Sequence, residues 1–269
     1  MSKTTLFVGD LHLQAKLILP LVEKTIKKHN VERVIFIGDY VDQWNQNDNS
    51  QLYLDELTLL NKFRNKLIKE SKVEPVFLIG NHDMPYLIGI PEYYSVYNRQ
   101  VFDKVHDLLL QLQPQIAYEV DDDFIASHAG YVYESIREVP EWHFEPWLYG
   151  YTDESVKLQM QVGMSRGGNY SSGGVLWADF GDFERGSLKI GRQIVGHTPQ
   201  KTIANVKYNA NGLNDNVNCI CVDTFSLNQF YNPIGDGSML LYKDDKFEVI
   251  KNPEWQSDEF ALKRLTHFN

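Results

Sequence analysis

Short apolar runs alternate with amphipathic stretches in the first part of the chain. The apolar runs at residues 4–8, 34–37 and 76–79 are bounded by polar or glycine residues, which predicts buried strands. Residues 17–28 and 51–70 lie between them and carry apolar side chains at helical spacing, which predicts two helices. Alternation of strand and helix is typical of right-handed βαβ units, so we expect a largely parallel sheet here.

The pattern changes in the second half of the chain. Residues 116–120 and 124–127 flank the triplet Asp121, Asp122 and Asp123, which predicts a hairpin with a solvated acidic turn rather than a metal site. Strands of a second sheet are predicted at residues 193–195, 203–208, 219–222, 238–242 and 247–250. A short charged turn joins the last two of these strands.

No repeat or linker-like change in composition divides the chain. We therefore expect a single domain over residues 1–269, with an aromatic and glycine-rich insertion at 131–185 and a C-terminal tail at 253–269. Aromatic side chains crowd the first part of the insertion: Tyr131, Tyr133, Trp142, His143, Phe144, Trp147, Tyr149 and Tyr151. They predict a small hydrophobic cluster under a long loop, with stacking against a nucleobase as the alternative.

Composition and charge narrow the possible classes of protein. Hydrophobic residues make up 43% of the chain and charged residues 23%, which is typical of a globular protein. The 26 basic and 36 acidic residues give a net charge of −10, which argues against generic binding to nucleic acid. The N-terminus does not resemble a signal peptide, no apolar run is long enough for a membrane span, and there are only two cysteines, so we expect a cytoplasmic protein.

Polar side chains follow five of the predicted strands at the point where each strand ends. The five segments are Gly9-Asp10-Leu11-His12, Gly38-Asp39-Tyr40-Val41-Asp42, Gly80-Asn81-His82-Asp83, His128-Ala129-Gly130 and Gly196-His197-Thr198-Pro199. Ligands bind outside the carboxyl ends of strands in open α/β sheets, and glycine lets the backbone turn sharply there. One such segment could be an ordinary turn or helix cap, but five in one chain predict a common site.

The residue types indicate a metal centre. Carboxylates, an amide oxygen and imidazoles, without thiolates, suit hard or borderline divalent cations. The donors are too many for one ion that must keep an open position. They suit two ions about 3.5–4 Å apart, bridged by a carboxylate and a water, which is an arrangement that activates the water and clamps a phosphoryl group.

The order of the five motifs resembles that of the calcineurin-like metallophosphoesterases. The resemblance is strongest to the branch that holds serine/threonine protein phosphatases, diadenosine tetraphosphatases and bacterial RNA-repair phosphatases. It extends to Val222-Asp223-Thr224, which is similar to a late strand of the family. The resemblance implies a four-layer α/β/β/α sandwich of two mixed sheets, with a dinuclear metal site at the carboxyl ends of the strands.

The resemblance also implies a role for each matching residue. Asp10 and His12 would bind the first metal, Asp39 would bridge both, and Asn81, His128 and His197 would complete the second. The two divalent cations are expected to be manganese, with iron, zinc, magnesium, cobalt and nickel as alternatives. His82 would protonate the leaving oxygen as general acid, and Asp42 would accept a hydrogen bond from His82 and hold it.

The phosphate-gripping arginines of the protein phosphatases are missing from the matching positions. Gln43 and Trp44 follow Asp42, and Met84 and Pro85 follow Asp83. A later Leu-Trp pair is followed by Ala178 and Asp179 rather than by the arginine found there in many relatives. Arg166, in a glycine-rich loop, is the candidate substitute for binding the substrate phosphate, and an ordinary solvated arginine is the alternative.

The sequence therefore predicts a binuclear metal-dependent phosphoesterase that uses a metal-bridging hydroxide. The expected substrate is a phosphomonoester on a phosphoprotein, a nucleotide or a nucleic-acid end, and no membrane partner is expected. A phosphodiesterase or dinucleoside polyphosphate hydrolase is the alternative, and a metal-binding interaction scaffold without activity is the alternative of another class. His29, His106 and His267 fit no motif, and we expect them to be ordinary surface or helix residues.

Overall fold

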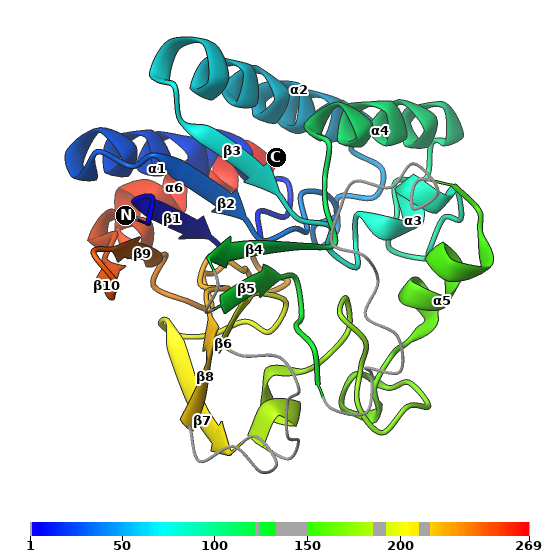
Figure 1. The fold of residues 1–269 in the computed structure, drawn as a ribbon. Coiled ribbons are helices and arrows are strands. Elements are labelled where there is room, and N and C mark those ends of the chain that lie inside the picture. The colour runs from blue at the N-terminus through cyan, green and yellow to red at the C-terminus, as the bar shows by residue number, and fades with distance from the viewer. Residues whose placement is uncertain (1, 122–123, 133–149, 185–191, 210–215, 269) are drawn as a thin grey trace.

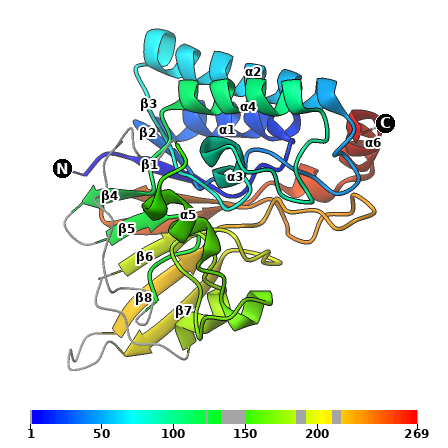
Figure 2. The same cartoon turned by 90° about the vertical axis from the view of Figure 1, so that its right-hand side faces the viewer.

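The computed structural model describes residues 2–121, 124–132, 150–184, 192–209 and 216–268. Two five-stranded sheets lie against each other, and most of the helices gather on the outer face of one of them (Figures 1 and 2). The helices are α1 (Ala15–His29), α2 (Ser50–Lys66), α3 (Met84–Ile88), α4 (Arg99–Leu112), α5 (Asp153–Met160) and α6 (Asp258–Phe268).

The first sheet has the strand order β10-β9-β1-β2-β3. Its strands are β1 (Thr5–Val8), β2 (Arg33–Phe36), β3 (Glu74–Phe77), β9 (Met239–Lys243) and β10 (Lys246–Ile250). The parallel pairing of β1, β2 and β3 confirms the predicted βαβ units. The assignment of residues 238–242 and 247–250 to the second sheet was wrong, because β9 pairs antiparallel with β1 and brings β10 with it.

The second sheet has the order β4-β5-β6-β8-β7. Its strands are β4 (Ala117–Asp121), β5 (Phe124–Ser127), β6 (Arg192–Val195), β7 (Ala204–Asn209) and β8 (Asn216–Cys221). β4 and β5 form the predicted antiparallel hairpin, while Asp122 and Asp123 of its acidic turn lie outside the described residues. β5, β6 and β8 run parallel, so their carboxyl ends meet at one edge of the sheet.

Three hydrophobic layers hold these elements together. One layer lies between the sheets and includes Phe7 from β1, Phe124 from β5 and Ile220 from β8. A larger layer joins the first sheet to α1, α2 and α4, which cover its other face (Figure 1). The third lies on the outer face of the second sheet, where a short 3-10 helix, Phe180–Glu184, packs over β7. The expected fold class of two mixed sheets with helices is confirmed.

The structure describes part of the predicted insertion and residues 253–268 of the predicted tail. The insertion contains α5 and a 3-10 helix at Met164–Arg166, and Tyr133, Trp142, His143, Phe144, Trp147 and Tyr149 lie outside the described residues. The tail forms a 3-10 helix, Pro253–Gln256, followed by α6, and it buries Trp255, Phe260 and Phe268 in the layer beside α1. Within the described ranges, none of the helices is long and apolar enough to cross a membrane.

Candidate metal centre

The carboxyl ends of β1, β2, β3, β5 and β6 converge where the two sheets meet, and each is followed by one of the predicted motifs. Close backbone approach explains two of the glycines. Gly38 has a φ of +109°, which other residues rarely adopt. A Cβ atom at Gly80 would collide with the carboxylate of Asp39. The glycines therefore let neighbouring loops bring their side chains to one point.

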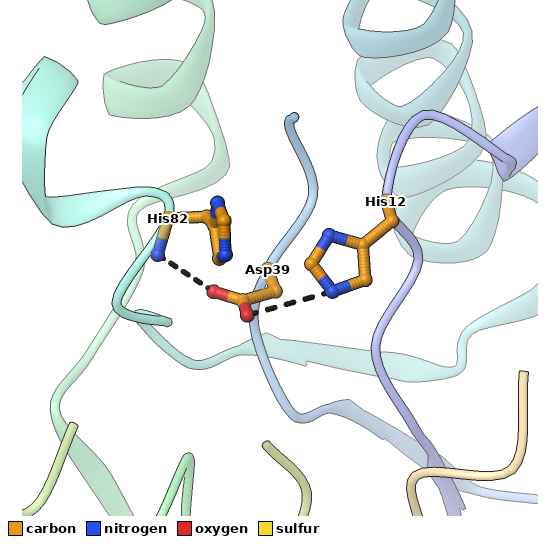
Figure 3. Close-up of side chains that lie close together, drawn as sticks. All are labelled: His12, Asp39 and His82. Atoms are coloured by element: carbon orange, nitrogen blue, oxygen red, sulfur yellow. Dashed lines mark hydrogen bonds and ion pairs between the residues drawn. The ribbon is translucent and has the colours of Figure 1, made fainter. Parts of the chain in front are cut away.

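Asp39 lies at the centre of the site. Its Oδ2 atom is 3.6 Å from Nε2 of His12 and 3.4 Å from Nε2 of His128. Its Oδ1 atom accepts a 2.8 Å hydrogen bond from the backbone N–H of His82 (Figure 3). One carboxylate thus faces imidazoles that come from different sheets, which is the position expected of a bridging ligand.

Backbone carbonyls orient the two imidazoles. Nδ1 of His12 lies 2.8 Å from the carbonyl oxygen of Asp42, and Nδ1 of His128 lies 2.9 Å from that of Ile37. Each Nδ1 must carry a proton to donate to its carbonyl, so a neutral ring presents its Nε2 lone pair to Asp39. This arrangement of a second hydrogen bond on the far nitrogen is typical of metal-binding histidine.

A second group of donors lies around His128. Its Nε2 atom is 3.0 Å from Oδ1 of Asn81 and 3.2 Å from Nδ1 of His197. The Nε2 atom of His197 is buried and has no hydrogen-bond partner among the described residues. Two sets of side chains, His12-Asp39-His82 and Asp39-His128-His197, have ligand atoms within 4.8 Å of one another and share Asp39. This donor set fits two divalent cations of the hard or borderline kind.

Asp10 and Asp223 are buried next to these donors. Asp10 is buried, and its carboxylate accepts hydrogen bonds of 3.1 and 3.2 Å from the backbone N–H of His197. Burial and then the nearby charge of Asp223 raise the pKa of Asp10 well above its ordinary value. Asp223 is also buried, and its Oδ2 has no hydrogen-bond partner in the described chain. The sequence signalled Asp223 only through the Val-Asp-Thr likeness, without a role.

The protonation of the central groups is set by their mutual contacts. Burial alone would raise the pKa of Asp39, but His128 and His82 outweigh it and hold this pKa well below its usual range. Burial would lower the pKa of His128, but Asp39 and Asp10 raise it to about 10. The cluster is therefore a network of carboxylates and imidazoles whose charges compensate one another.

His82 and Asp42 form the predicted pair. Nδ1 of His82 lies 3.1 Å from Oδ2 of Asp42. The other oxygen of Asp42 accepts hydrogen bonds from the hydroxyls of Tyr53 (2.8 Å) and Tyr86 (2.6 Å). Burial would lower the pKa of His82, but the charge of Asp39 and the hydrogen bond to Asp42 raise it above its ordinary value. No motif identified Tyr53 and Tyr86, which orient Asp42 from α2 and α3.

Asp83 supports the loops rather than joining the donors. Its carboxylate accepts hydrogen bonds from the backbone N–H groups of Asp39 (2.8 Å), Tyr40 (2.9 Å) and Gly80 (2.9 Å). Burial and the charge of Asp39 raise the pKa of Asp83 to about 7. Asp83 therefore ties the loop after β3 to the loop after β2.

Arg166 lies beside the second group of donors. One of its terminal nitrogens donates a 2.6 Å hydrogen bond to the Thr198 hydroxyl and lies 3.4 Å from the carbonyl oxygen of His197. Its Nε atom is 2.9 Å from Oδ2 of Asp179, and both side chains are 25% exposed. The Leu-Trp stretch that lacks an arginine thus supplies the carboxylate that holds Arg166 in place.

Three loops, at residues 43–49, 91–98 and 227–232, contact one another at one side of the site. The Asn45 side chain donates to the carbonyl of Gln229, and the indole of Trp44 donates to that of Leu227. The backbone N–H of Tyr97 donates to the carbonyl of Asn47. We call the exposed aromatic side chains of these loops the aromatic rim: Trp44 (57% exposed), Tyr93 (87%), Tyr97 (73%) and Phe230 (68%).

The aromatic rim is connected to the pair formed by His82 and Asp42. The ring of Tyr94 lies 4.5 Å from that of His82 and 5.0 Å from that of Tyr93, measured between centroids. The Tyr86 hydroxyl, which donates to Asp42, accepts a 2.9 Å hydrogen bond from the backbone N–H of Val96. The loop that carries Tyr93 is therefore fixed relative to His82, and no pattern in the sequence indicated this contact.

Comparisons with known proteins give consistent results. A family model described as "Calcineurin-like phosphoesterase" matches residues 3–201. A cold-active protein-tyrosine phosphatase of a psychrophilic Shewanella is 17% identical, with a TM-score of 0.60 over 93% of this chain and 81% of that one. A point mutant of a cold-active protein tyrosine phosphatase is 16% identical, with a TM-score of 0.63 and the same coverage. No curated protein matched the sequence.

Proposed function

Because the chain belongs to the calcineurin-like phosphoesterase family and is a metal-dependent phosphoester hydrolase, we propose that it hydrolyses a phosphomonoester. One observation carries this proposal: Asp39 lies between the imidazoles of His12 and His128, and a backbone carbonyl near Nδ1 of each ring orients it. We propose Asp10, His12 and Asp39 as ligands of one cation and Asp39, Asn81, His128 and His197 as ligands of the other. Manganese is the first expectation for both.

Different groups of the site would have different roles in the reaction. Two bound cations would lower the pKa of a shared water and neutralise charge on the phosphoryl group. His82 is placed to donate a proton to the leaving oxygen, and its raised pKa favours the protonated form that this requires. Asp42 holds His82 through Nδ1, which leaves Nε2 as the atom that donates.

The metal requirement and the type of ester can be tested together. Chelator treatment is expected to abolish hydrolysis of p-nitrophenyl phosphate, and Mn²⁺ is expected to restore it. Rates on p-nitrophenyl phosphate and bis-p-nitrophenyl phosphate, measured side by side, compare monoester with diester. Faster hydrolysis of the diester would support the phosphodiesterase alternative. Full metal binding without hydrolysis of either ester would support the scaffold alternative.

We propose that Arg166 binds the substrate phosphate. Its guanidinium lies beside His197 and is held by Asp179, so it is oriented before substrate arrives. Arg166→Ala is expected to raise the KM for p-nitrophenyl phosphate by about 10- to 150-fold, the range for loss of a charge-assisted hydrogen bond worth about 1.5–3 kcal/mol. Arg192→Ala, at an exposed position on β6, is the matched control. An unchanged KM in Arg166→Ala would make this residue an ordinary loop arginine.

The aromatic rim favours a peptide over a nucleic acid as the leaving group. Residues 43–49, 91–98 and 227–232 include Asp48 and Glu92 but no lysine or arginine. Binding to a nucleic-acid strand depends on cationic side chains that neutralise its phosphates. Exposed aromatic side chains beside polar amides are typical of protein interfaces instead. We therefore propose a phosphoprotein as the substrate, with the residues flanking the phosphorylated position lying on the rim.

Substitutions in the aromatic rim test this choice. Trp44→Ala and Tyr93→Ala are expected to lower kcat/KM for a phosphopeptide about tenfold more than for p-nitrophenyl phosphate, consistent with loss of about 1.4 kcal/mol of binding. Peptides with phosphotyrosine and with phosphoserine should both be assayed, because the similar solved structures include protein tyrosine phosphatases. Ile68→Ala, which removes an exposed apolar side chain outside the three rim segments, is the control.

A nucleic-acid substrate would give a different result with the same rim variants. If the rim variants impaired hydrolysis of a 5′-phosphorylated oligonucleotide and left the phosphopeptides unaffected, the substrate would be a nucleic-acid end.

We also propose that the chain is one domain and that it acts in the cytoplasm. The proposed ligands extend from Asp10 to His197 and meet at one site, which supports a single unit. Cys219 and Cys221 are both free and buried, which supports a reducing compartment.

A further inference from the structure

The loop that carries His12 has an unusual backbone. His12 has a φ of 41° and Leu13 a φ of 56°, so two consecutive residues other than glycine adopt the left-handed region. Such residues cost free energy and persist only where the surrounding structure holds them. On one side, the backbone N–H groups of His12 and Leu13 donate to the carbonyls of Asp39 (2.8 Å) and Tyr40 (3.1 Å).

On the other side, the loop is held by α6 from near the far end of the chain. Nε2 of His267 lies 2.8 Å from the carbonyl oxygen of Leu13, which can only accept a hydrogen bond, so the imidazole donates. His267 is a helix residue, as expected, but its side chain is only 5% exposed, so it does not lie on the surface. The sequence offered no signal for this contact, because 254 positions separate the two residues.

His267 also lies near the start of α1, the helix that follows the His12 loop. Its Nε2 is 3.7 Å from Oε1 of the buried Glu56 on α2. Glu56 accepts a 3.0 Å hydrogen bond from the backbone N–H of Lys16 in the first turn of α1, where Gln14 provides no side-chain cap. α2 and α6 therefore fix the start of α1, and with it the end of the His12 loop.

The neighbouring residue of α6 supports the second loop of the site. The carbonyl of Phe268 accepts a 3.0 Å hydrogen bond from the side chain of Gln46, which follows Asp42 in the loop after β2. The Phe268 ring stacks on that of Tyr231 at 4.6 Å, and the Tyr231 hydroxyl donates to the carbonyl of Trp44. His267 and Phe268 thus contact the loop after β1 and the loop after β2, and neither contacts the metal-binding side chains.

We propose that α6 is a positioning element for the metal centre, and that His267 holds the strained His12–Leu13 backbone so that Nε2 of His12 faces Asp39. His267 is thus a positioning residue that acts through Leu13. Without its hydrogen bond, the loop can relax toward ordinary backbone angles and carry His12 away from Asp39. This inference rests on the proposed metal site and predicts weaker binding of the cation that His12 ligates.

Paired substitutions separate positioning from packing. His267→Leu removes the donor at similar size, whereas His267→Gln keeps an N–H donor. In chelator-treated protein titrated with Mn²⁺ and followed by electron paramagnetic resonance, His267→Leu is expected to weaken one of two Mn²⁺ sites by about tenfold, the lower range for groups that orient ligands. His267→Gln is expected to bind like the unsubstituted protein. Thr266→Ala, on the exposed side of α6, is the control.

A second measurement keeps the test independent of the metal. Backbone hydrogen exchange in residues 11–17 of the metal-free protein is expected to be faster in His267→Leu than in His267→Gln. If the unsubstituted protein bound neither Mn²⁺ nor any of the alternative cations, the proposed function would fail, and this exchange would still decide the positioning role. Equal exchange, or a lowered Tm with unchanged Mn²⁺ affinity, would overturn the proposal. His267→Asn, which is too short to reach Leu13, replaces the leucine variant if that one does not fold.

Discussion

Asp39→Asn is expected to abolish hydrolysis of p-nitrophenyl phosphate. Asp39 is the one carboxylate shared by both groups of donors, with Oδ2 facing His12 on one side and His128 on the other. An amide at this position is nearly isosteric but has no negative charge, so neither cation would be held at full affinity. We expect kcat/KM to fall by at least about 10³-fold, the equivalent of roughly 4 kcal/mol of lost transition-state stabilisation.

The cause of the loss can be checked directly. Mn²⁺ titration of chelator-treated Asp39→Asn should show that binding at both sites is weakened. Asp55→Asn, on the exposed face of α2, makes the same chemical change away from the site and should behave as the unsubstituted protein. If Asp39→Asn kept both Mn²⁺ sites and normal turnover, Asp39 would not be the bridging ligand.

His82→Asn is expected to lower kcat according to how much the leaving group needs a proton. Loss of general acid catalysis typically costs about 10²- to 10⁴-fold. The larger loss should occur with an alkyl phosphate, whose alkoxide leaves poorly, and the smaller with p-nitrophenyl phosphate. A uniform loss over a series of leaving groups would mean that His82 does not donate the proton.

The pH profile gives a second measurement of the same role. The hydrogen bond to Asp42 helps to raise the pKa of His82, and a general acid works only below its pKa. Asp42→Asn should lower that pKa, so activity should be lost at lower pH, with the alkaline limb shifted down by about one unit. The acidic limb should stay in place. An unchanged alkaline limb would argue against His82 as the titrating acid.

The position of Arg166 relative to the donors could not be predicted from the motifs. Motif order identified positions where phosphate-gripping arginines are missing, and it singled out Arg166 only because that residue lies in a glycine-rich loop. The contacts of Arg166 with Asp179 and Thr198 place it beside His197. Contacts of this kind depend on how two distant loops pack, and no local pattern encodes them.

The positions of the strands could be predicted from local patterns, but their pairing could not. Hydrophobic runs located every described strand, because burial of alternate or consecutive side chains leaves a local pattern. They did not show that β9 pairs with β1, since the choice of partner strand depends on contacts between residues far apart in sequence. α4 (Arg99–Leu112) was not predicted, although its apolar residues recur at helical spacing.

The two-sheet α/β class, the family and the residues gathered at the strand ends could all be predicted without coordinates. This was possible because glycine, aspartate, asparagine and histidine stand directly after apolar runs, where strand geometry brings them together. Three features could not be predicted: the carbonyls that orient His12 and His128, the tyrosines that hold Asp42, and the contact of His267 with Leu13. Each of these is a contact between side chains and backbone across tens or hundreds of positions, and it exists only once the layers have packed.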